Sequence, residues 1–430
     1  MLTLVVPITA LLMGVSLLLL GSGLLNTLLA IRGGLEGYAD NTMGFIMSGY
    51  FFGFFIGTFL ALPLIQRVGH IRTFACCAAI ASCSVLLHEL SVHPLSWLLL
   101  RVMTGAVLVI LYTVIESWLN AQTSGSQRGR VFAVYMAVNL GSLAIAQQLL
   151  RLGSAESFLL FAVSAILVSI SLVPITLTRI KQPEVSVVPR LKLSAIYRFS
   201  PVAAAGALLS GLAMGGFWGM GAIYAGRIGL DSHGVATFMS FAILGGALFQ
   251  FPLGRYSDTH DRRKVLAVVT LLAAVAAALL WITSLFGYWV YLAAALYGGF
   301  AFAIYPVSVA MLMDKLEPEN ILSGASSLLF LHGVGAAVGP ALAGQLMSWM
   351  GSQALTLYFV AMQMVLCLFA VRNLQNSMTV TSDQPAHFVP MVRTTPTVLE
   401  MLPDEEQETM QGETVSDETP HTEEEVAGRI

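Results

Sequence analysis

The sequence predicts an all-α membrane protein of twelve transmembrane helices, arranged as two pseudo-symmetric halves of six helices each. Three observations support this fold class: an apolar composition, twelve long apolar runs and an internal repeat. Of the 430 residues, 57% are hydrophobic and only 10% are charged, whereas a soluble domain carries about 25% charged residues. A chain this long and this poor in charge must present apolar surface to lipid.

Twelve apolar runs are long enough to cross a bilayer, which requires about 20 mainly apolar residues. The first run is too long for a signal peptide and has no basic segment before it, so we expect it to be a spanning helix. The links are short, apart from residues 179–200 in the middle of the chain. The runs begin near Leu4, Met43, Thr73, Leu95, Val131, Phe158, Pro201, Val235, Val265, Tyr288, Leu322 and Ala354.

The positive charges indicate how the chain is oriented. If both termini are cytoplasmic, the cytoplasmic links hold fifteen Lys and Arg residues, and the external links hold only Arg32, Arg151 and Arg227. Because Lys and Arg are enriched in cytoplasmic links, we expect a multi-pass protein of the bacterial inner membrane with both termini in the cytoplasm.

The two halves repeat at an offset of about 192 residues. Gly14 corresponds in this way to Gly206, and Gly53 corresponds to Gly245. Internal repeats mark many secondary transporters, whose substrate site lies between the repeats near the membrane midplane. The predicted parts are an N-terminal half at 1–180, a cytoplasmic linker at 181–200, a C-terminal half at 201–372 and an acidic tail at 373–430.

The tail differs in composition from the rest of the chain. Twelve acidic residues and only two basic residues follow Arg372, so we expect the tail to be disordered and solvated. Its apolar segment 397–402 offers an alternative, in which the tail docks on the basic cytoplasmic face.

A motif made of a glycine, an acidic residue and basic residues links the eighth and ninth runs. It contains Gly254, Asp258, Arg262 and Arg263. The glycine permits a tight transition from helix to loop, and the carboxylate can interact with a helix N-terminus or with an arginine. A plain basic cytoplasmic loop is the alternative interpretation of this motif.

The link between the second and third runs carries the matching copy, with Arg67, Gly69 and Arg72, but has Gln66 in place of the acid. The two copies resemble the loop motif of the major facilitator superfamily. Residues 112–120, together with Tyr305, Pro306 and Asp314, resemble a largely uncharacterised bacterial subgroup of it. The resemblance covers residues 4–372 and implies the two-half fold and alternating access. Because only the second copy has the acid, we expect a charged gating latch only in the C-terminal half.

Two charged residues lie inside the fourth run, Arg101 and Glu116. Arg101 begins an Arg-x-x-x-Gly element that resembles the superfamily element linked to proton coupling, although it could instead reach the external interface. Glu116 is the only acidic residue well inside an apolar run, and burial suits it to carry a proton. Its alternative role is a salt bridge at the gate with Arg67, Arg128 or Arg130.

The resemblance also implies which helices line a central cavity, namely the first, fourth, seventh and tenth. Because the cavity candidates on these helices are aromatic and amide side chains with almost no fixed charge, a small amphipathic or neutral compound is the expected substrate. A polar residue here more often bonds another helix than a ligand. The cavity candidates are Asn26, Tyr112, Trp218, Tyr224, Tyr297 and Tyr305.

We therefore expect a secondary transporter rather than an enzyme, and proton-coupled export as its activity. No phosphate-binding loop motif is present, so ATP is not expected to drive it directly. The alternatives are proton-coupled uptake or facilitated diffusion of a nutrient, and a transporter-like sensor that signals through its tail. The expected partners are a small-molecule substrate, protons and the lipid bilayer, and we expect a monomer with no cofactor, metal or nucleic acid.

Overall fold

The structure, a computed structural model, describes residues 2–123, 125–178, 197–374 and 388, and within these ranges it contains helices and no strands. Twelve of its helical spans are long and apolar enough to cross a membrane. The predicted twelve-span fold is confirmed, and each span begins within six residues of the predicted position. The predicted linker and tail lie largely outside the described residues.

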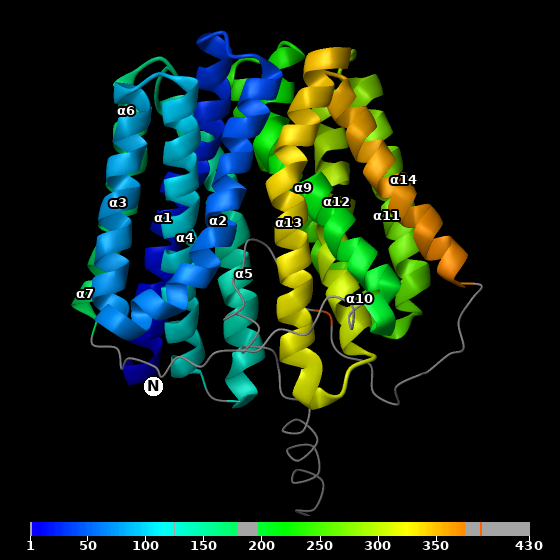
Figure 1. Ribbon diagram of the computed structural model, residues 1–430, viewed down its shortest axis with the longest axis horizontal. Helices are drawn as coiled ribbons and strands as arrows, with labels where there is room; N and C mark the ends of the chain where they lie inside the picture. Colours follow the sequence, from blue (N-terminus) through cyan, green and yellow to red (C-terminus); the bar gives the residue numbers. More distant parts are fainter. Residues whose placement is uncertain (1, 124, 179–196, 375–387, 389–430) are drawn as a thin grey trace, which may run out of the picture.

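The helices follow one another in two groups (Figure 1). The N-terminal half contains α1 (Leu2–Leu35), α2 (Asp40–Val68), α3 (His70–Leu90), α4 (Pro94–Gln122), α5 (Gly125–Gln148), η1 (Leu149–Leu152), α6 (Phe158–Ile170) and α7 (Leu172–Leu177). The C-terminal half contains α9 (Pro201–Arg227), α10 (Ser232–Thr259), α11 (Arg262–Thr283), α12 (Trp289–Met313), α13 (Pro318–Met350) and α14 (Ala354–Leu374).

Local sequence explains where several helices begin. Ser200, Asp231 and Asp261 precede α9, α10 and α11, and each side chain accepts a hydrogen bond from a backbone N–H of the first turn. These caps satisfy donors that have no partner within the helix. The tight link between α2 and α3 depends on Gly69, whose φ of 83° favours glycine.

The sixth span is divided between α6 and α7 at Ser171. Pro174 lies in the first turn of α7, and a proline has no N–H to donate to the carbonyl four residues earlier. The break between α6 and α7 therefore has a cause in the sequence, although the apolar run continues through it.

Backbone contacts at glycines show the repeat in three dimensions. In the N-terminal half, a Cβ at Gly53 of α2 would collide with the carbonyl of Val102 in α4, and a Cβ at Gly105 of α4 would collide with the carbonyl of Tyr50. The two helices are therefore in contact backbone to backbone, as small residues permit.

The same reciprocal contact joins α10 and α12 in the C-terminal half. A Cβ at Gly245 would collide with the carbonyl of Ala295, and a Cβ at Gly298 would collide with the carbonyl of Ala242. These glycines follow Gly53 by 192 residues and Gly105 by 193. The structure thus confirms that the halves repeat one helix arrangement.

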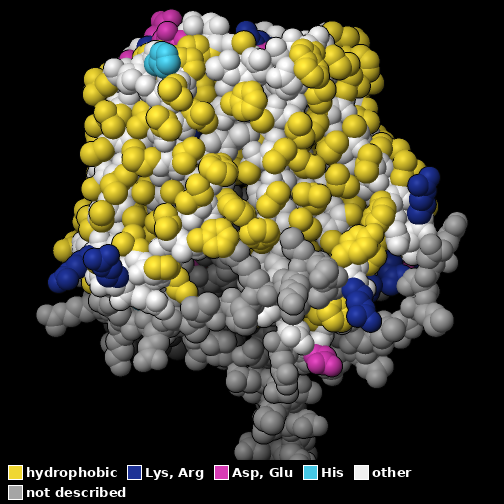
Figure 2. All heavy atoms as spheres, viewed as in Figure 1, with side chains coloured by type: hydrophobic (Ala, Val, Ile, Leu, Met, Phe, Trp, Pro, Cys, Tyr) yellow, Lys and Arg dark blue, Asp and Glu magenta, His cyan; other side chains and the backbone are white. Residues whose placement is uncertain are grey.

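Among the described residues, the backbones of the two halves come closest on one side of the molecule. We define the outer side as the side where α1 ends and α2 begins, and the inner side as the opposite one. In Figure 1, α2 and α13 lie side by side near the top, which is the outer side, and diverge toward the bottom. Figure 2 shows apolar side chains over most of the same face, with charged side chains at the two rims, as a lipid-facing surface requires.

Candidate functional site

An ion pair joins the halves at the outer rim. Asp40 begins α2, Arg227 ends α9, and an Oδ1 to Nη2 distance of 2.9 Å separates their charged groups. Arg227 also donates a hydrogen bond to the carbonyl of Tyr38, at 3.2 Å. We name Tyr38, Asp40 and Arg227 the outer gate.

Small residues and hydrogen bonds extend this closure inward from the outer gate. A Cβ at Gly44 of α2 would lie only 2.6 Å from the carbonyl oxygen of Pro340 in α13, so the helices touch there. On the other side of the interface, Gln148 donates to the Ser240 hydroxyl at 2.6 Å, and this hydroxyl donates to the carbonyl of Ala144 at 3.0 Å. The outer side is therefore closed along both α2–α13 and α5–α10.

A buried polar cluster lies below the outer gate and joins α1, α4 and α9. The amide of Asn26 donates to the carbonyl of Trp218 at 2.9 Å and accepts a hydrogen bond from the Arg101 guanidinium at 2.6 Å. Arg101 is only 1% exposed, and its guanidinium carbon lies 4.5 Å from the centre of the Tyr50 ring. Arg101 thus turns into the protein, where it holds Asn26 against the other half.

Glu116 lies in a separate pocket toward the inner end of α4. Its side chain is 0% exposed, and one carboxylate oxygen accepts a hydrogen bond from the hydroxyl of Tyr135 in α5, at 2.8 Å. Tyr112, one helical turn earlier in α4, is also buried and lies beside Phe54 of α2. Glu116 and Arg101 are both buried but belong to different clusters, as their separation along α4 predicts.

A cluster of the C-terminal half joins α9, α12 and α13. The rings of Tyr305 in α12 and His332 in α13 lie 4.3 Å apart, and His332 lies within hydrogen-bond distance of the Ser210 hydroxyl, at 3.2 Å. The buried hydroxyl of Tyr305 has no hydrogen-bond partner among the described residues. His332 is partly exposed, which leaves part of its ring available for another contact.

The side chains of the remaining cavity candidates do not all point toward the other half. Tyr224 points toward α11 and the start of α14, because its hydroxyl lies 3.3 Å from the carbonyl of Leu280 and 3.3 Å from the side-chain oxygen of Gln353. Tyr297 stacks on Phe359 of α14, with ring centres 4.7 Å apart. Trp218 packs against Phe217 and Phe302 of its own half. The structure brings together Asn26 and Trp218, but it places Tyr224 and Tyr297 within the packing of the C-terminal half.

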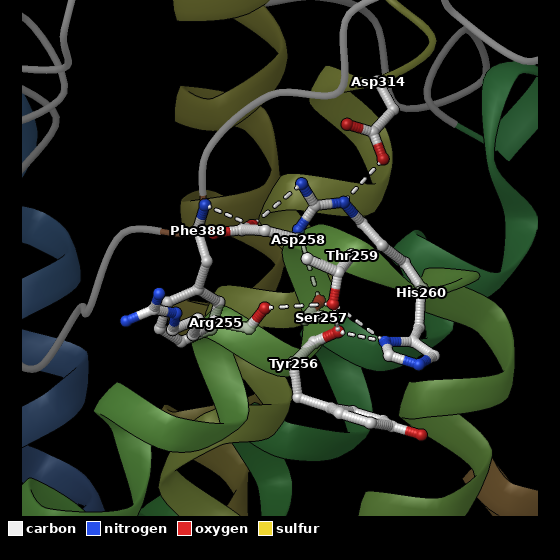
Figure 3. Close-up of polar contacts among 9 residues, drawn as sticks. Arg255, Tyr256, Ser257, Asp258, Thr259, His260, Asp314 and Phe388 are labelled. Carbon is white, nitrogen blue, oxygen red and sulfur yellow. Dashed lines mark hydrogen bonds and ion pairs between the residues drawn. The ribbon is translucent and has the colours of Figure 1, made fainter.

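The motif of the C-terminal half forms an ion-pair network at the inner side. Arg262 begins α11, is 5% exposed, and contacts Asp258 of α10 at 3.2 Å and Asp314, which follows α12, at 2.6 Å. Asp258 and Asp314, both labelled in Figure 3, therefore contact one guanidinium from α10 and from the residue that follows α12. We name Asp258, Arg262 and Asp314 the inner latch, because they tie α10, α11 and α12 together.

Other residues of this motif surround the inner latch. Gly254 is buried, whereas Arg263 is partly exposed and its backbone N–H is capped by Asp261. Lys315 lies beside Asp314 beyond the membrane span. Its partial burial and the neighbouring Arg263 charge lower the pKa of Lys315.

The N-terminal copy of the motif has no comparable network. Arg67 and Arg72 are exposed, and neither forms an ion pair with another residue that the structure describes. Gln66 is exposed as well, so the position equivalent to Asp258 faces outward without a charge. The geometry therefore differs between the two copies, since among the described residues only the C-terminal copy pairs an acidic side chain with a buried arginine.

Sequence reasoning missed several members of these clusters. Tyr135 lies 19 residues from Glu116, and no spacing rule pairs residues on two helices that pack side by side. The contact of Asp40 with Arg227 was partly predictable, because the predicted helix ends place both residues at the external surface. Nothing in the sequence predicted that Phe388 contacts the inner latch.

The fold and these clusters define a polytopic membrane transporter built from two six-helix halves that close against each other on one side. The family model of the Major Facilitator Superfamily matches residues 11–239 and 203–399. The protein belongs to the Major Facilitator Superfamily, whose members are secondary transporters that work by alternating access, and it is a multi-pass inner-membrane protein.

Relatives and solved structures agree with this assignment. The chain is 26% identical over 392 residues to the uncharacterized MFS-type transporter YcaD of Escherichia fergusonii. The matched stretch covers 89% of this chain and 98% of that protein. The same identity extends over 377 residues of YcaD from Escherichia coli, covering 85% and 96%.

Two solved structures share the fold at low sequence identity. The nucleoside transporter NupG has a TM-score of 0.69 and 14% identity, covering 86% of this chain and 99% of its own. A bacterial homologue of the lysosomal transporter Spinster, in an inward-facing and occupied conformation, has a TM-score of 0.70 and 16% identity, covering 87% and 98%.

Proposed function

We propose that this protein couples transport to protons through Glu116 and exports a small amphipathic or neutral compound. The supporting observation is the burial of Glu116, which is the only acidic residue among the buried polar side chains that the structure describes. An ionisable group inside the membrane is costly to retain, so its presence favours a functional role.

The surroundings of Glu116 suit a group that binds and releases a proton. Tyr135 donates a hydrogen bond to the carboxylate, which supports the charged form, whereas removal from water disfavours that form. Because Tyr135 lies on α5 and Glu116 on α4, a change in how these helices pack would alter this balance. Alternating access would then expose Glu116 to water in one state and bury it in the other.

The substrate class follows from the aromatic cluster of Tyr305 and His332. A ring face and an unused hydroxyl at Tyr305 offer apolar contact together with one hydrogen bond. Tyr112, which follows the same repeat 193 residues earlier, adds a second aromatic ring from the N-terminal half. Such a site favours a compound with an apolar body and a neutral polar group.

Proteoliposomes containing a pH-sensitive dye test the proposed coupling. Compounds that raise the thermal unfolding midpoint of the purified protein are added under a pH gradient, and proton flux and compound accumulation are followed together. Glu116→Gln should abolish gradient-driven accumulation and keep equilibrium binding, whereas Glu317→Gln, the same change at an exposed helix start, should preserve both. Accumulation by Glu116→Gln with unchanged proton dependence would exclude the coupling role.

Inverted membrane vesicles distinguish export from the alternatives. Export predicts that vesicles acidified inside by respiration accumulate the compound. Accumulation only in right-side-out vesicles would instead identify uptake of a nutrient. Binding without flux in either orientation would favour a sensor.

A further inference from the structure

We propose that the C-terminal tail regulates this transporter as an intramolecular wedge, in which Phe388 occupies the surface of α10 that the N-terminal half must approach to close the inner side. The proposal rests on alternating access, but it is independent of proton coupling and of the substrate. It assigns the inner end of α10 as an interaction surface and the chain's own tail as its partner.

Phe388, the residue of the tail beyond residue 374 that the structure describes, contacts α10. The backbone N–H of Phe388 donates to Asp258 of the inner latch at 2.8 Å, as Figure 3 shows. The Phe388 ring lies directly on Gly254, one turn earlier, where an added Cβ would come within 2.7 Å of the ring carbon Cε1. The ring also packs against the apolar core. One residue thus makes a polar and an apolar contact with the same helix face.

This face of α10 is the one that meets α5 on the outer side. An α-helix presents the same face again after about 18 residues, or five turns. The outer contacts with Gln148 of α5 involve Ala236 and Ser240, and Gly254 and Asp258 follow these residues by 18 positions each. α10 remains one helix through Thr259, although Pro252 inside it removes one backbone hydrogen bond. Gly254 and Asp258 therefore continue the α5-facing stripe toward the inner side.

Closure of the inner side requires the inner ends of the halves to approach each other. A glycine on the approaching face allows two helices to come into close contact, as Gly44 does between α2 and α13. At Gly254 the phenyl ring of Phe388 takes this space, so α5 cannot reach α10 while the tail is docked. The docked tail therefore stabilises the state that is open on the inner side, and transport requires its release.

A distance measurement tests the wedge without any substrate. Spin labels on Arg130→Cys of α5 and Lys264→Cys of α11, both exposed at the inner side, report its opening after Cys76 and Cys83, the exposed native cysteines, are replaced by serine. Phe388→Ala should raise the population with short distances about fivefold, the factor expected from removing a half-buried phenyl contact. Phe388→Leu should restore much of the long-distance population.

Met410→Ala is the matched control in the full-length chain, because it removes a large apolar side chain 22 residues further along the same tail and outside the apolar segment 397–402. It should leave the distances unchanged. A larger effect of Met410→Ala than of Phe388→Ala, or no effect of Phe388→Ala, would overturn the proposal.

A reversible crosslink provides the second test. Arg255 directly follows Gly254, against which the docked ring lies, so Arg255→Cys and Phe388→Cys should form a disulfide on mild oxidation. The crosslinked protein should remain in the long-distance state, and reductant should release it. Failure to form the crosslink, or short distances in the crosslinked protein, would contradict the wedge. Because neither readout uses flux, failure of the wedge remains distinguishable from failure of proton coupling.

Discussion

Asn26 donates its hydrogen bond to the carbonyl of Trp218, which is its own counterpart in the internal repeat, 192 residues later. A contact between equivalent positions of two pseudo-symmetric halves lies at their pseudo-twofold axis. Arg101 contacts the same amide from α4. The hydrogen bond that joins the halves at their centre is therefore held in place by the intramembrane arginine of the N-terminal half.

We expect Asn26→Leu to weaken the closed outer side. The substitution removes an acceptor from a buried guanidinium and a donor from the interface, which should cost about 2 kcal/mol of stability. The midpoint of thermal unfolding should fall accordingly. Asn373→Leu is the control, because Asn373 donates to a carbonyl of its own helix. Equal midpoints for the two variants would contradict a role for Asn26 at the centre.

The outer gate should make a small, salt-dependent contribution to closure. Arg227 is 40% exposed in its ion pair with Asp40, and exposed pairs contribute about 0.5 kcal/mol, which is about a twofold population shift. Arg227→Gln should therefore about double the fraction of molecules in which spin labels at Leu35 and Trp349 are far apart. The reversed pair, Asp40→Arg with Arg227→Asp, should restore closure. The difference from wild type should shrink in high salt, and a salt-independent difference would exclude the ion pair as its cause.

The two copies of the loop motif should respond unequally to mutation. Asp258→Asn removes the charge that faces Arg262 but keeps the oxygen that accepts the Phe388 N–H. This variant should lower the initial transport rate more than Gln66→Ala does. Asp314→Asn should act similarly, because it leaves Arg262 with less compensation in a buried position. Equal transport rates for Asp258→Asn and Gln66→Ala would argue against a charged latch on one side.

Two glycines that are equivalent by the repeat should resist substitution to the same extent. Gly105→Ala and Gly298→Ala would each drive a methyl group into a carbonyl of the neighbouring helix, at a cost of about 1–3 kcal/mol. Gly141→Ala in α5 is the control, since nothing lies within 4 Å of its added Cβ, and it should cause no loss of stability. Thermal unfolding of the three variants in detergent compares them directly, and equal midpoints would contradict the backbone contacts.

Both termini should lie in the cytoplasm. The uneven distribution of Lys and Arg supports this orientation. An alkaline phosphatase fusion after Arg372 should be inactive, and a fusion within the link at Glu36 should be active. The reverse pattern would invert the inner and outer sides.

The repeat and the spans were predictable because they depend on composition and spacing. Gly53 and Gly245 are separated by the repeat offset of 192 residues, which can be found in the sequence. In the structure, both allow close backbone contact with a neighbouring helix. The directions of Tyr224 and Tyr297 were not predictable. In a soluble helix the apolar face indicates the core, but lipid is as apolar as the interior, so hydrophobicity does not indicate which way a membrane helix is rotated.

The partners of charged groups were predictable only within one motif. Asp258 and Arg262 lie four residues apart, and helical spacing brings such residues together. The contact of Glu116 with Tyr135 depends instead on how α4 and α5 pack. The tail contact at Phe388 depends on a glycine surface that becomes visible only once α10 is placed.

The glycine contacts between α2 and α4, and between α10 and α12, also limit how each half can deform. Where two backbones touch, no side chain lies between them that could change its rotamer or be compressed to absorb a displacement. Each helix pair therefore moves as a rigid unit. A movement that separates Asp40 from Arg227 at the outer end is then transmitted to the inner end, beside Gly254, with little deformation of the helices.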